Sequence, residues 1–85
     1  MTGWRMAAIG WSIDEIKIGG LNVWKQEWRP VKADKVLLPN PAYPKQIHAY
    51  DIYEIGEPSC PVCFAASELS NGVWGFYVPD KNSSN

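Results

Sequence analysis

The stretch that decides the fold is CFAASELSNGVWGFYV, residues 63–78. Two alternating segments flank Asn71-Gly72, a dipeptide typical of the type I′ turn between antiparallel strands, so we predict a β-hairpin. A two-residue loop places three cross-strand pairs on its apolar face: Leu69 with Trp74, Ser67 with Phe76, and Ala65 with Val78. The opposite face is mixed, as expected for a surface that meets solvent or a partner. A short helical turn over residues 64–69 is the alternative.

A second hairpin is predicted around the glycine pair at residues 19–20, with Ile18 opposite Leu21. Continuing this ladder outward brings Trp11 opposite Trp28, but the alternation changes phase on the way. A bulge near residues 14–15 would restore the phase, and bulges of this kind let small sheets curl.

The remaining segments complete an all-β pattern. Residues 46–55 carry apolar side chains on both faces, which predicts a central strand. Residues 30–46 contain four prolines and are expected to form an extended arm, with a short edge strand at residues 36–38. We therefore predict a small, strongly curled antiparallel sheet of five or six short strands, in a barrel or a sandwich. One β domain is expected over residues 1–79, followed by a flexible tail at 80–85.

Composition limits the classes of function. The net charge of −1 argues against general nucleic-acid binding, which needs a basic face. No apolar run approaches the roughly 20 residues of a membrane-spanning helix, and no signal-type apolar core follows the start, so we expect a soluble, cytoplasmic protein. Residues 1–45 carry a charge of +3 and residues 46–85 a charge of −4. These two sets either interleave in the folded sheet or support head-to-tail association.

Cys60 and Cys63 form the one motif with reactive side chains at a meaningful spacing. A redox pair needs its first thiol at a helix N-terminus, whereas this pair follows predicted strands. A zinc site needs two further ligands, for which His48, the one histidine, and Asp51 are the nearby candidates. We expect structural thiols, neither catalytic residues nor a bound cofactor.

The aromatic side chains are the candidate binding residues. The chain has five Trp, four Tyr and two Phe, a large apolar load for one small core. Trp24 and Trp28 are four apart and should share a face, joined by Trp11 opposite Trp28, so they line a strip if that face is not core. Tyr43, between prolines, is expected to pack on its own domain, with docking into a partner's groove as the alternative.

The function that these observations favour is a non-enzymatic binding or assembly module that self-associates through aromatic surface. Its expected partner is a second copy, with another protein as a possible partner. A thiol-redox or zinc protein using Cys60 and Cys63 is the second hypothesis, and a carbohydrate- or peptide-binding module is the third.

Overall fold

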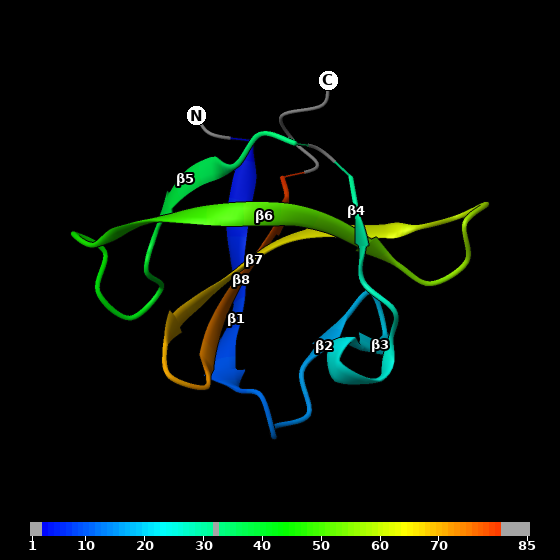
Figure 1. Cartoon of the computed structure of the whole chain (residues 1–85), viewed down its shortest axis with the longest axis horizontal. Helices are drawn as coiled ribbons and strands as arrows, with labels where there is room; N and C mark the ends of the chain where they lie inside the picture. Colours follow the sequence, from blue (N-terminus) through cyan, green and yellow to red (C-terminus); the bar gives the residue numbers. More distant parts are fainter. Residues whose placement is uncertain (1–2, 32, 81–85) are drawn as a thin grey trace.

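The computed structural model describes residues 3–31 and 33–80. Six antiparallel strands form the main sheet in the order β1-β8-β7-β6-β4, and β5 also pairs with β6 (Figure 1). Strands β2 and β3 form a separate two-stranded sheet. The bounds of the strands and of the 3₁₀ helix η1 are β1 Trp4–Trp11, β2 Lys17–Ile18, β3 Leu21–Asn22, η1 Val23–Lys25, β4 Arg29–Pro30, β5 Val36–Pro39, β6 Ile47–Ile55, β7 Val62–Ser70 and β8 Val73–Pro79.

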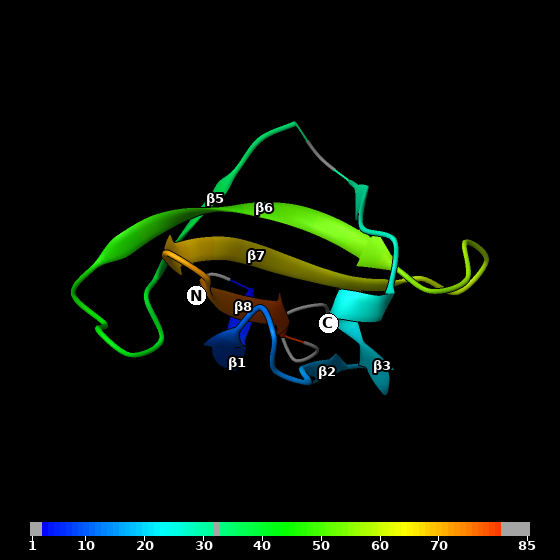
Figure 2. The ribbon, with the colours of Figure 1, turned by 60° about the horizontal axis from the view of Figure 1, so that its bottom comes forward.

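This architecture confirms the predicted all-β class and the curled antiparallel sheet. The six strands do not close into a barrel. Figure 2 shows β6, β7, β8 and β1 following one another across the sheet, with β2, β3 and η1 on one side of it. The predicted central strand is β6, which pairs with β4, β5 and β7. Of the predicted tail, Asp80 donates its amide to the Gly3 carbonyl (2.7 Å), and residues 81–85 lie outside the described residues.

The hairpin predicted at Asn71-Gly72 is confirmed, because Ser70 of β7 pairs with Val73 of β8 across this turn. The predicted type I′ conformation of this turn is wrong. A type I′ turn needs positive φ at both central residues, but among the described residues only glycines have it, Gly72 at +81° included. The Gly72 amide donates to the Glu68 carboxylate (2.9 Å), which ties the turn to β7. Residues 64–69 are strand, so the helical alternative is wrong.

The register of the β7–β8 hairpin departs from the predicted one beyond the turn. A bulge between Glu68 and Ser70 makes Leu69 an extra residue in β7. The pairs that follow are Glu68 with Trp74, Ser67 with Gly75, Ala66 with Phe76 and Ala65 with Tyr77. A shift by one residue moves side chains to the other face of a strand. Both faces of this hairpin are consequently buried in part, and the predicted mixed face is wrong.

The first hydrophobic core lies where the β2–β3 hairpin and η1 cover one face of the sheet. The hairpin confirms the predicted pairing of Ile18 with Leu21, and its two glycines at 19–20 have φ of +61° and +82°, as a type I′ turn requires. The buried members of this core are Ile16, Ile18, Val23, Ile55, Phe64, Ala66 and Phe76.

The predicted continuation of this hairpin toward Trp11 and Trp28 is wrong. The Asn22 side chain accepts a hydrogen bond from the Trp24 amide (3.0 Å) and caps η1, so the chain turns into a 3₁₀ helix where a longer strand was predicted. Trp11 instead ends β1, where it pairs with Val73. The predicted bulge at residues 14–15 is replaced by the connection between β1 and β2.

The second core occupies the other face of β6, β7 and β8. Its buried members are Leu38, Tyr50, Ile52, Ala65 and Tyr77. Leu38 comes from β5, which confirms the short strand predicted in the proline-rich arm. The hydroxyl groups of Tyr50 and Tyr77 both donate to the Pro39 carbonyl, at 2.8 and 3.0 Å. The arm thus supplies the acceptor that two buried phenols require.

Stability is expected to fall at alkaline pH through Tyr50. Burial, with a smaller contribution from Tyr77, raises the pKa of Tyr50 from 10.0 to about 12. Because the folded state favours the neutral phenol, this contribution is complete below pH 10 and is lost as the pH rises toward 12. Over that range the parent should lose about 2 kcal/mol more unfolding free energy than Tyr50→Phe. Urea denaturation at several pH values measures the difference, and equal losses would contradict the raised pKa.

Candidate interaction surface

Two of the candidate binding residues, Trp24 and Trp28, lie side by side in the first core. Their rings stack with centroids 5.3 Å apart, and both pack against the buried residues of that core. The indole N–H of Trp28 donates to the Val23 carbonyl (2.7 Å). The two residues share a face as predicted, although they lie on and after η1, and that face is turned inward.

Trp11 does not join them. It lies at the end of β1, is 55% exposed, and places its ring 3.3 Å from the position that a Cβ on Gly72 would take. The described residues therefore contain no exposed strip of three tryptophans, because two members of the predicted strip are packed in the core.

Tyr43 lies in the loop between β5 and β6 and is 63% exposed. The predicted packing of this ring onto its own domain is therefore wrong. Buried Asn40 shapes the loop: its amide donates to the Gln46 carbonyl (2.7 Å) and its side chain accepts from the Ala42 amide (2.9 Å). The loop is thus held by its backbone while the Tyr43 ring faces outward.

His48, the histidine considered as a further zinc ligand, does not lie near the cysteine pair. Cys60 is exposed and Cys63 half-buried, and both are free thiols. Cys63 pairs with Glu54 of β6, whereas His48 lies six residues back along that strand, which corresponds to about 20 Å. The described residues include no group of three His, Cys, Asp or Glu side chains arranged to hold a metal ion. Strand β7 starts at Val62, so no helix follows the motif as the redox hypothesis requires.

The charged halves of the chain interleave at the β4 and β5 edges. The Arg29 guanidinium contacts the Glu54 carboxylate (Nε–Oε1 3.3 Å) and also donates to the Gly56 carbonyl (2.9 Å). Lys35 pairs with Asp51. Each pair joins the basic half to the acidic half within one molecule, which reduces the charge available for head-to-tail association.

A row of exposed apolar side chains lies on β1, for which no strand was predicted before Trp11. Within residues 3–31 and 33–80, β1 pairs with β8 alone, so its other side is an edge of the sheet. Met6, Ile9 and Trp11 are 57%, 43% and 55% exposed. Their partners in β8, Tyr77, Gly75 and Val73, place all three on the face of the second core. The signal in the sequence is a pair of apolar residues, spaced two apart, on each side of Ala7-Ala8: Trp4 and Met6 before it, and Ile9 and Trp11 after it.

The backbone N–H and C=O groups of Met6, Ile9 and Trp11 point away from β8. At Trp11 the amide donates to the Asp14 carboxylate (2.8 Å) and the carbonyl accepts from the Asp14 amide (3.0 Å), so neither faces β8. The alternation of antiparallel ladders gives Ile9 the same outward direction. At the other end of β1, the Gly3 carbonyl accepts from the Asp80 amide, so the backbone groups of Gly3 face β8. Because the direction alternates along the strand, the backbone groups of Met6 point outward as well.

A bulge between Met6 and Ala8 breaks this alternation. Two successive outward-facing residues, Met6 and Ile9, are therefore three positions apart, where a regular strand would place them two apart.

Comparison with known proteins gives no relative: no family model, curated protein or solved structure matches the chain. Within the described residues, no helix has the length and apolar character needed to cross a membrane.

Proposed function

We propose that the chain is a non-enzymatic assembly module that pairs with a second copy of itself through the edge of β1. One observation carries the proposal: an eight-residue edge strand presents Met6, Ile9 and Trp11 as exposed apolar side chains. Edge strands that must stay unpaired usually carry charges, prolines or a bulge that turns the edge away. From residue 6 to residue 11, β1 has no charge and no proline, and its bulge leaves the backbone groups of Met6 and Ile9 directed outward.

The spacing of the outward backbone groups favours a second copy as the partner. A regular strand offers such groups every second residue, so it can pair with Met6 and Ile9 only across a bulge, as β8 does on the other side of β1. An antiparallel copy of β1 offers the same step in reverse. In this arrangement Met6 faces the partner's Ile9 and Ile9 faces the partner's Met6, which gives a two-fold symmetric contact.

The ends of β1 support a short shared ladder. The backbone groups of Trp11 are already bonded to Asp14, so the new pairing is confined to the part of β1 between Met6 and Ile9. Trp11 still contributes its exposed ring, on the same face as Met6 and Ile9. Apolar side chains from both copies thus cover one another beside the new ladder.

Light scattering on the Ile9→Lys variant tests this proposal. We expect the parent to be a dimer at micromolar concentration, with a mass that high salt does not change, because the contact is apolar. Ile9→Lys should raise the dissociation constant at least about tenfold, since a lysine on an edge opposes strand pairing.

Leu37→Lys is the matched control. Leu37 is also apolar and 68% exposed, but it lies on β5. This variant should keep the mass of the parent. A monomeric parent, or dissociation by Leu37→Lys and not by Ile9→Lys, would contradict pairing through β1.

A further inference from the structure

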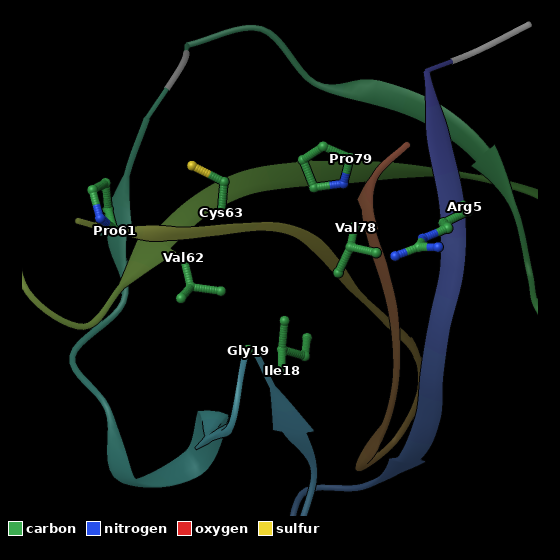
Figure 3. A pocket seen from close by; sticks show the side chains of 8 residues that line it. All are labelled: Arg5, Ile18, Gly19, Pro61, Val62, Cys63, Val78 and Pro79. Atoms are coloured by element: carbon green, nitrogen blue, oxygen red, sulfur yellow. The ribbon is translucent and has the colours of Figure 1, made fainter. Parts of the chain in front are cut away.

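A pocket of about 550 Å³ lies between the tip of the β2–β3 hairpin and the strands β7, β8 and β1 (Figure 3). This volume is within the range of small-molecule sites in proteins. The pocket is lined largely by apolar residues from segments far apart in the sequence: Ile18, Pro61, Val62, Val78 and Pro79.

Close packing of the hairpin tip against β7 forms the floor of this pocket. A Cβ added to Gly19 would lie 2.9 Å from both methyl groups of Val62, so the backbone of the hairpin comes nearer to β7 than any side chain would allow. The positive φ of Gly19 (+61°) is a second reason why only glycine fits at this position. The close contact between the β2–β3 hairpin and β7 therefore fixes this side of the pocket.

Of the described residues that line the pocket, Arg5 is the one that carries a charge. It pairs with Val78 and lies on the first-core face of β1, and Figure 3 shows its side chain reaching from β1 toward Val78. The Arg5 side chain makes no ion pair or hydrogen bond with any residue of the described ranges. An unpaired guanidinium beside an apolar wall matches a ligand that has an anionic group and an apolar body.

We infer that this pocket binds a small amphipathic anion, whose alkyl body lies against Ile18, Val62 and Val78 and whose carboxylate or phosphate pairs with Arg5. Both head groups accept paired hydrogen bonds from a guanidinium. Met6 and Ile9 do not line the pocket, so this inference does not rest on pairing through β1.

Titration of the full chain with octanoate and, separately, with octyl phosphate tests the inference by calorimetry, below the concentrations at which these probes form micelles. We expect saturable binding of at least one probe to one site per chain, and the pair of titrations identifies the preferred head group. Octanol, which has the same alkyl body without the charge, should bind at least about tenfold more weakly, because it cannot form the charge-assisted pair.

Two variants locate the site. Arg5→Met replaces the guanidinium side chain by an apolar one of similar length and should weaken binding at least about tenfold. Lys25→Met removes an exposed cation on η1, outside the pocket, and should leave the affinity unchanged. Thermal melts establish that both variants fold. Failure of both probes to bind, equal binding of octanol, or equal loss in the two variants would overturn the inference.

Discussion

Replacing Trp28 by alanine should lower the free energy of unfolding by about 3–5 kcal/mol, the range for a large aromatic side chain removed from a core. Trp28 is the centre of the aromatic cluster on the first core. Its ring centroid lies within 6.0 Å of five others, those of Trp24, Tyr53, Phe64, Trp74 and Phe76. Its indole N–H also satisfies the Val23 carbonyl, so the variant leaves a cavity and removes a hydrogen bond.

Trp11→Ala is the matched control, since it removes the same side chain from an exposed position. It should cost less than about 1 kcal/mol. Both variants are best made in the Ile9→Lys chain, because association would otherwise add a concentration-dependent term to the stability. Urea denaturation gives the two free energies. Equal losses for Trp11→Ala and Trp28→Ala would mean that Trp28 is not part of the core.

The positions of the turns could be predicted from the sequence because glycine dipeptides mark them locally. The pair at residues 19–20 and Asn71-Gly72 both lie at hairpin turns. The register of the β7–β8 hairpin could not be predicted. The bulge makes Leu69 an extra residue, so that Ala65 pairs with Tyr77 and Ala66 with Phe76, and no local signal in residues 63–78 marks it.

The candidate surface was harder to predict than the fold. The spacing of Trp24 and Trp28 correctly indicated a shared face, but spacing does not say whether a face is covered. Trp74 of β8, far along the chain, packs against both rings and turns that face into core. Strand β1 was missed because its bulge interrupts the alternation that identifies strands, between Met6 and Ala8.

That bulge is also the centre of the proposed assembly. It places Met6 and Ile9 at a spacing that a second copy of β1 reproduces when it runs antiparallel. Each Met6 then faces the partner's Ile9 across the new ladder. Opposite charges at these two positions should consequently pair across the contact, while like charges should oppose it.

Sedimentation velocity on two charged variants tests this arrangement most directly. One variant carries Met6→Glu and Ile9→Glu, and the other carries Met6→Lys and Ile9→Lys. We expect each variant alone to be a monomer, because like charges face each other in both pairs, and an equimolar mixture to form a one-to-one dimer that dissociates as salt screens the charges. If each variant alone keeps the mass of the parent, or if the mixture stays monomeric at low salt while the parent dimerises, the two copies do not pair through β1.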